Sequence, residues 1–254
     1  MKKLDILLLT IFPFLATGLS LYFKTNFLVS IFLFFGLPSL WFTYRTPHKS
    51  LKTLIFASVF TIPMVLLIDY LAGGDASWHV ATIFPVRILD TIPIEDFFVG
   101  FGMAYYTIIF YEHFLDKGKH DLIDKHMKYV IWPFILLFTV VLGNYFLMDK
   151  PLTIPYAYLW LGIILIIVPC VTFLSIFPRL LSKYVTTSAY FFLLYLIFEI
   201  TALELEQWSF PGNNFIGWIE LFQYRFPFEE LFFWIGTSTI AILSYYEFFD
   251  DDRK

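Results

Sequence analysis

Eight apolar stretches of about 20 residues each run through the chain and leave it few ways to fold. A stretch of this kind crosses a bilayer as a helix, because the backbone must satisfy its own hydrogen bonds there. The chain is 59% hydrophobic and 15% charged, whereas ordinary soluble domains are about one-quarter charged. The sequence therefore predicts an all-α integral membrane protein with eight spans, at 4–23, 27–44, 51–71, 92–111, 129–147, 156–177, 185–203 and 227–249.

The basic residues orient these spans. Thirteen of the 17 Lys and Arg fall on one side of the membrane if all eight stretches cross it, and basic loops are typically cytoplasmic. We expect both termini in the cytoplasm, loops 72–91 and 204–226 outside, and a location in the bacterial inner membrane. The first span lacks a small-residue cleavage site and is expected to be a retained helix.

A four-residue motif occurs twice, as Pro93-Ile94-Glu95-Asp96 and as Pro227-Phe228-Glu229-Glu230, at the start of the fourth and the eighth span. Proline is well tolerated in the first turn of a helix, and acids beside it lie at the positive end of the helix dipole. A carboxylate at the edge of a lipid-embedded helix is costly and is by default a functional hypothesis. Each motif is expected to aim two carboxyl groups into the space at the outer end of its helix.

The surroundings of the motif are duplicated as well. Asp69 precedes Trp78 by nine residues, and Glu199 precedes Trp208 by the same interval. Four spans per unit point both units the same way through the membrane. We therefore expect two tandem four-helix repeats, 1–115 and 129–254, joined by a cytoplasmic linker at 116–128.

The ends of the two motif helices match too. Tyr111-Glu112 near the end of the fourth span corresponds to Tyr246-Glu247 near the end of the eighth, one residue out of register. With this topology the ionisable residues within the spans are expected to gather at the outer face.

The same pattern is present twice: an acid, a Trp nine residues later, a loop, and then Pro-x-Glu-[Glu/Asp] at the start of an aromatic-rich helix. This duplicated pattern resembles the heterodimeric-type lycopene cyclase family. The likeness is to its fused, single-chain form and covers about residues 4–249. One departure is Asp96, where Glu is common in the family, and another is Glu199 opposite Asp69 of the first half.

The resemblance implies that lycopene β-cyclase activity converts the acyclic ends of lycopene to β-ionone rings, without redox change and without a cofactor. Such a reaction needs an acid that protonates a terminal alkene, a cation that closes onto a neighbouring double bond, and a base that removes a ring proton. Burial and a neighbouring carboxylate both favour the protonated form of a carboxyl group, which suits general acid–base work.

The candidate catalytic residues are six acids: Glu95, Glu229, Asp96, Glu230, Asp69 and Glu199. Glu95 and Glu229 are the preferred candidates for catalysis. Asp96 and Glu230 are equally well explained as helix caps or as residues that raise the pKa of a neighbouring acid. Asp69 and Glu199 are either catalytic or structurally paired, with Arg87 or Arg225 as partners. Aromatic faces attract cations, and the candidates for contact with substrate are Trp78, Trp208, Phe98 and Phe232.

Other chemistries find little support. The single cysteine, Cys170, allows no internal disulfide, the five histidines lack the spacing of a metal site, and no dinucleotide-binding fingerprint is present. Nothing predicts nucleic-acid binding. The expected partners are lycopene or a similar carotenoid from the lipid phase, membrane lipids, and other enzymes of the carotenoid pathway.

Two alternatives stay open. A C50 carotenoid cyclase or a hydratase would use a similar cation, and sequence does not show whether water reaches it. A proton-coupled transporter would also use intramembrane carboxylates, but broken helices and polar residues through both halves of the membrane are typical of transporters.

Overall fold

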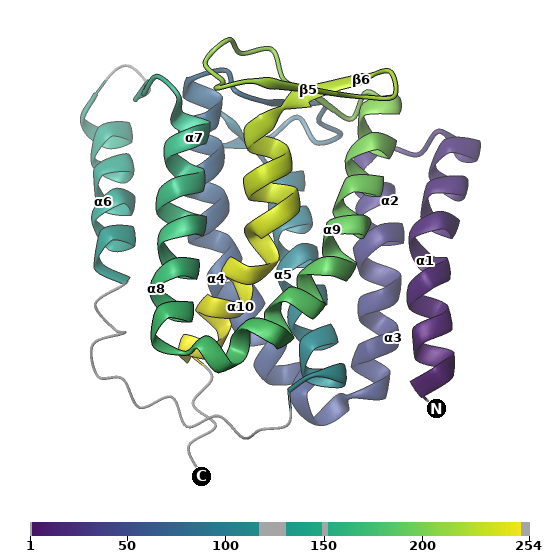
Figure 1. Ribbon diagram of the computed structural model, residues 1–254. Helices are drawn as coiled ribbons and strands as arrows, with labels where there is room; N and C mark the ends of the chain where they lie inside the picture. Colours follow the sequence, from purple (N-terminus) through teal and green to yellow (C-terminus); the bar gives the residue numbers. More distant parts are fainter. Residues whose placement is uncertain (1, 117–130, 149–151, 250–254) are drawn as a thin grey trace.

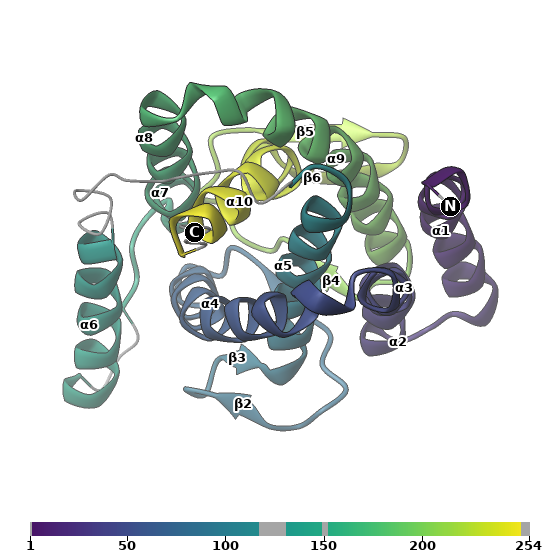
Figure 2. The same cartoon turned by 90° about the horizontal axis from the view of Figure 1, so that it is seen from below.

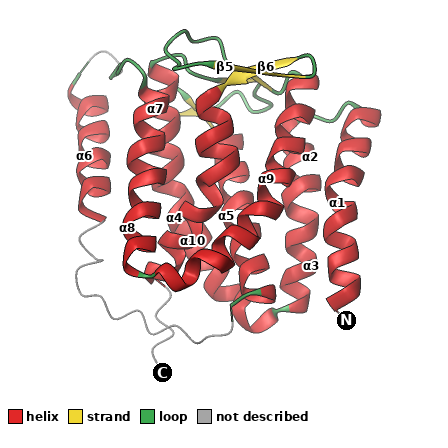
Figure 3. Ribbon diagram, viewed as in Figure 1, coloured by secondary structure: helices red, strands yellow, loops and turns green. Residues whose placement is uncertain are grey.

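A computed structural model describes residues 2–116, 131–148 and 152–249. In this part of the chain, eight helical rods stand side by side, and three two-stranded ribbons cover one end of the bundle (Figure 1, Figure 3). We call the end with the ribbons the outer end. The rods are α1 (Lys2–Phe23), α2–η1–α3 (Phe27–Ile31, Phe32–Gly36, Leu37–Arg45), α4 (Pro47–Gly74), α5 (Ile94–Phe114), α6 (Ile131–Leu147), α7–η3–α8 (Ala157–Leu161, Gly162–Ile167, Val168–Ile176), η4–α9 (Pro178–Leu180, Leu181–Glu204) and η5–α10 (Glu230–Thr237, Ser238–Phe249).

Five of the described helices are long and apolar enough to cross a membrane. Large apolar side chains such as Val59, Leu136 and Val171 are exposed on the outside of the bundle, as expected where lipid replaces water. These features indicate a multi-pass integral membrane protein. The five helices are Lys3–Phe23, Phe27–Arg45, Pro47–Gly74, Ala157–Ile176 and Pro178–Glu204.

The other three rods are shorter or less apolar than these five helices. The α6 helix has only 17 residues. The α5 helix contains Glu95, Asp96 and Glu112, and the last rod contains Glu230 and Glu247. Such charged residues lower the mean hydropathy of a helix. The rods nevertheless lie close to the eight predicted stretches. The predicted linker at 116–128 lies, apart from Asp116, outside the described residues.

The bundle has a central group of helices and two peripheral ones. The views from the side and from below place α1 and α6 at opposite edges, with α4, α5, α9 and α10 between them (Figure 1, Figure 2). The most extensive contact joins α4 to α5. Gly100 permits this approach, because a Cβ there would meet Val65 Cγ2 at 2.9 Å.

Three short ribbons close the outer end. Ribbon β2–β3 (Arg87–Ile88, Ile92–Pro93) leads into α5, and ribbon β5–β6 (Trp218–Leu221, Tyr224–Pro227) leads into the last rod. The third ribbon pairs β1 (His79–Val80) with β4 (Trp208–Ser209), so the two long outer loops are bound to each other.

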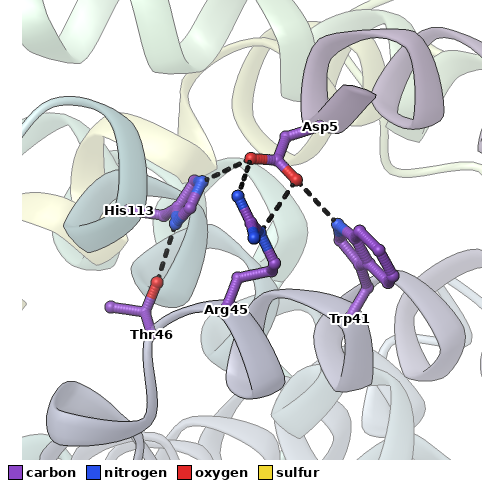
Figure 4. Close-up of polar contacts among 5 residues, drawn as sticks. All are labelled: Asp5, Trp41, Arg45, Thr46 and His113. Carbon is purple, nitrogen blue, oxygen red and sulfur yellow. Dashed lines mark hydrogen bonds and ion pairs between the residues drawn. The ribbon is translucent and has the colours of Figure 1, made fainter. Parts of the chain in front are cut away.

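At the inner end, a buried carboxylate fastens α1 to the bundle (Figure 4). Asp5 accepts hydrogen bonds from Trp41 Nε1 at 3.1 Å and from Arg45 Nε and Nη2 at 3.1 and 2.9 Å. His113 Nε2 lies 3.2 Å from Asp5 Oδ2, and the other nitrogen of its ring lies 2.7 Å from Thr46 Oγ1. Asp5 is therefore an ion-pair anchor between α1, α3 and α5.

A second inner network joins the two motif helices. Tyr111 donates a hydrogen bond to Glu247, and Tyr246 donates one to Glu112. Lys49 Nζ lies 3.3 Å from Glu112 Oε2. The expectation that ionisable residues gather only at the outer face is therefore wrong, because Tyr and Lys partners reduce the cost of burying acids at the inner end.

We expect the inner and outer ends to face opposite sides of the membrane. In a Cys170→Ser background, His48→Cys lies exposed in the first turn of α4 at the inner end, and Asn213→Cys lies in an exposed outer loop. A membrane-impermeant maleimide should label residue 213 in intact bacterial cells and residue 48 only after permeabilisation. Labelling of both positions in intact cells would contradict the predicted topology.

Candidate functional site

A cavity of about 180 Å³ lies inside the bundle, between α4, α5, α7–η3, α9 and η5–α10. Its lining is mainly apolar and aromatic. Four buried acids also line it, one from each of four helices. They are Asp69 of α4, Asp96 of α5, Glu199 of α9 and Glu230 of η5. Acids from widely separated parts of the sequence thus meet in one space, which we call the chamber.

The acids occupy only the outer end of the chamber. From Asp69, the lining continues inward along α4 to Phe60, nine residues or about 14 Å at the usual helical rise. On the last rod it runs from Glu230 to Tyr245. The inward part is lined by apolar and aromatic groups such as Met64. The chamber is therefore elongated, with acids at one end and an apolar passage beyond them.

The four acids fall into two pairs. Asp69 and Asp96 interact electrostatically, as do Glu199 and Glu230. Trp208 Nε1 donates a hydrogen bond to Glu199 Oε1 at 3.0 Å, which gives a physical meaning to the nine-residue interval between them. One acid of each pair comes from the long helix before the outer loop, and the other comes from the duplicated motif.

Within each motif, it is the second acid that faces the chamber. Consecutive residues of a helix point about 100° apart, so adjacent carboxyl groups can face different surroundings. Asp96 and Glu230 line the chamber, whereas Glu95 and Glu229 do not. The structure thus separates the two acids of each motif into different environments.

The first acid of each motif binds the outer loop that precedes it. Glu95 Oε1 accepts hydrogen bonds from the backbone N–H groups of Ile83 and Phe84 at 2.6 and 2.8 Å. Glu229 Oε1 accepts one from the N–H of Ile216 at 2.7 Å. Both glutamates are completely buried. Their geometry favours a role in holding the loops over one in contact with substrate.

The two outer loops form a joint cover over the acids. Val80 pairs with Trp208 across the β1–β4 ribbon, and the rings of Trp78 and Trp208 lie 5.9 Å apart. A Cβ at Gly212 would meet the carbonyl oxygen of Ala76 at 2.8 Å, so glycine permits the close approach of the second loop to the first. Both tryptophans line the chamber together with the acids.

Two of the four aromatic residues expected at the substrate lie elsewhere. Trp78 and Trp208 line the chamber, but Phe98 and Phe232 do not. Their side chains are 47% and 44% exposed, on the outside of their helices. The reason is again helical periodicity, which turns the residue two positions beyond Asp96 or Glu230 to the opposite face.

The arginines have partners other than the two expected acids. Arg87 donates to the carbonyl oxygens of Thr91 and Val80 at 2.7 and 3.4 Å, and Arg225 lies 4.4 Å from the ring centre of Trp218. Within the described ranges, no ion pair joins either arginine to Asp69 or Glu199. Arg87 still contributes its positive charge to the surroundings of Asp96.

Sequence reasoning missed Tyr158 in the chamber. It is the second residue of α7, lines the chamber, donates a hydrogen bond to Glu230 and stacks on Trp234 with ring centres 5.4 Å apart. Nothing nearby in the sequence distinguishes it from the other 15 tyrosines. Only alignment of the two halves gives a signal, because Phe27 stands 131 residues earlier, the interval that also separates Pro38 from Pro169.

No protein family, curated protein or solved structure that was compared matches this chain.

We predict that Glu95→Ala and Glu95→Gln will differ in their effect on the outer loop. Alanine removes the acceptor of the N–H groups of Ile83 and Phe84, whereas glutamine keeps one oxygen there. Hydrogen exchange should accelerate at these two amides in the alanine variant and stay near wild type in the glutamine variant. Equal, slow exchange in both variants would show that Glu95 does not hold the loop.

Proposed function

We propose that this protein is a cofactor-independent membrane enzyme that cyclises the acyclic ends of lycopene, or of a similar linear carotenoid, by acid–base chemistry. The observation that carries the proposal is the chamber, in which four acids meet at one end of an otherwise apolar, elongated cavity. An apolar passage suits a polyene, and grouped acids under aromatic cover suit proton transfer to and from it.

The chemistry can be assigned to the chamber without a cofactor. A protonated carboxyl group gives its proton to the terminal alkene, and the resulting cation closes onto the neighbouring double bond. A carboxylate then takes a proton from the ring. The rings of Trp78, Trp208 and Trp234 line the same space, and aromatic faces stabilise a nearby cation. The paired outer loops limit the access of water, which would otherwise capture the cation.

Several correspondences support an origin in two tandem repeats. A π-helical segment interrupts the second rod of each half, at Phe32–Gly36 and at Gly162–Ile167. A hairpin precedes each motif helix, and the inner Tyr–Glu bonds run both ways between the halves. A π-helix accommodates an extra residue, so η5 accounts for the one-residue offset after the second motif. The proposed repeats are 1–115 and 129–254.

The chamber supports one shared site. Asp69 and Asp96 come from the first half, and Glu199 and Glu230 come from the second. Because the acids lie at one end only, a linear substrate would place a single end beside them, with the rest of its chain in the apolar passage. The two ends of lycopene would then react in separate binding events, and a monocyclic intermediate would be released between them.

The alternatives make different demands on the same chamber. A hydratase would need water beside the cation, and a C50 cyclase would need space for a longer end group. A proton-coupled transporter would need a polar route to the inner end, where Glu112 and Glu247 instead bind tyrosines of the facing helix.

We predict that the chain alone, made in lycopene-accumulating bacteria, will convert lycopene to β-cyclised carotenoid. A monocyclic product should appear before the bicyclic one, because the chamber receives one end at a time. Pigments extracted at successive times and separated by chromatography would test both statements. Unchanged lycopene in membranes that contain the folded protein would refute the proposed function, whereas hydroxylated products would favour the hydratase.

We predict that the second acid of each motif matters more for catalysis than the first. Asp96→Asn and Glu230→Gln should each lower conversion by about 10²–10⁴-fold, the usual contribution of a general acid or base. Glu95→Gln and Glu229→Gln should stay within about tenfold of wild type, because an amide oxygen still accepts the loop N–H groups. Conversion rates at equal protein content in membranes would measure this. A larger loss of conversion in Glu95→Gln and Glu229→Gln than in Asp96→Asn and Glu230→Gln would instead assign catalysis to the first acid of each motif.

A further inference from the structure

The two acids that the motifs place in the chamber have different hydrogen-bonding environments. Glu230, 7% exposed, accepts a hydrogen bond from the buried hydroxyl of Tyr158. Asp96, 2% exposed, accepts no hydrogen bond from an N–H group or a hydroxyl group within the described part of the chain, and its side-chain partner is the carboxyl group of Asp69. The two halves are therefore unlike at the place where the proposed chemistry occurs.

The difference can be traced to one pair of residues. Tyr158 corresponds to Phe27 of the first half, at the 131-residue interval that also relates Pro38 to Pro169. Phe27 is buried and packs on the ring of Trp208, with centres 5.4 Å apart. Phe27 has no hydroxyl group that could donate a hydrogen bond to the acid of its own half.

A buried carboxyl group without a donor holds its proton, because an isolated anion in an apolar site is very costly. An O–H donor aimed at a carboxylate stabilises the anion through a charge-assisted hydrogen bond. Mutual repulsion also prevents neighbouring acids from all being ionised together. The anion in the chamber is thus better placed on Glu230, and the proton on Asp96.

We propose that the chamber divides the reaction between its halves: Asp96 is the acid that protonates the polyene, Glu230 is the base that removes the ring proton, and Tyr158 positions the base. This assignment rests on the proposed function and extends it. Glu230 and Asp96 are catalytic residues in this scheme, whereas Tyr158 acts through Glu230.

The steps balance without a further reactant. The Asp96 O–H bond breaks as its proton binds the terminal alkene carbon, and Asp96 becomes an anion beside the charge of Arg87. The π electrons of the next double bond form the ring bond. Glu230 then takes a ring proton, and the electrons of that C–H bond form the new double bond. Return of one proton from Glu230 to Asp96 restores the start, and Asp69 interacts electrostatically with Tyr158 and by a side-chain hydrogen bond with Asp96.

Deuterium labelling separates the acid from the base. Membranes containing wild type, Asp96→Asn or Glu230→Gln would be supplied with lycopene in D₂O, and the recovered carotenoids would be analysed by mass spectrometry. Wild type should insert one deuterium per ring. Glu230→Gln should form few rings but return labelled lycopene, because the cation forms and reverts. Asp96→Asn should return unlabelled lycopene. Label in lycopene from Asp96→Asn, or from neither variant, overturns the assignment.

Tyr158→Phe tests the positioning role. Loss of one hydrogen bond to a charged group should lower ring formation roughly ten- to a hundred-fold and raise the ratio of labelled lycopene to rings. Tyr184→Phe is the matched control, since its buried hydroxyl donates to the carbonyl oxygen of Leu243 at 3.2 Å outside the chamber, and it should keep the wild-type ratio.

The ratio is measured within one sample, so it does not depend on how much protein folds. An unchanged ratio in Tyr158→Phe would overturn the positioning role. Failure of the wild type to cyclise or label lycopene would refute the proposed function itself, whereas wild-type cyclisation with the variant pattern reversed would refute only this division of roles.

Discussion

The cost of burying a carboxyl group in a lipid-embedded bundle governs much of this structure. Each buried acid needs donors, a cation or a proton, and the chain uses all three means. Asp5 receives an arginine and a tryptophan, and Glu112 receives a tyrosine and a lysine. Glu95 receives the backbone N–H groups of a loop. In the chamber, Glu199 and Glu230 receive one donor each, from Trp208 and Tyr158, and these acids face apolar space.

This cost also explains why the outer loops are ordered around the motifs. A loop that approaches a buried glutamate gains an acceptor for N–H groups that would otherwise be unpaired, and the glutamate gains donors. The loop is then held beside the chamber, where the β1–β4 ribbon joins it to the other loop. The first acid of each motif thus contributes to the cover, and the second contributes to the space beneath it. Two adjacent acids serve two purposes because the helix turns them apart.

The sequence was sufficient to predict the helices but not the contacts between them. Length and hydropathy determine where a segment can cross a bilayer, so the predicted stretches lie close to the helical rods. Glu199 and Trp208, which the sequence singled out by their nine-residue interval, are joined by a direct hydrogen bond. Helix rotation, by contrast, depends on packing against neighbours, so the sequence did not show whether Glu95 or Asp96 faces the chamber. The tyrosine partners of Glu112 and Glu247 come from the opposite half of the chain, and no local pattern reveals them.

Near-symmetry of the proposed repeats would give a reason for the proposed site with two roles. Two like halves would bring two like pairs of acids together, but the proposed cyclisation needs one group that gives a proton and another that takes one. If all four acids had the same surroundings, their repulsion alone would decide which was ionised, and the charge would be shared among them. A single hydroxyl group on one side, at Tyr158 and not at Phe27, removes that equivalence. Duplication would then supply the chamber, and one difference between the copies would determine which acid gives a proton and which takes one.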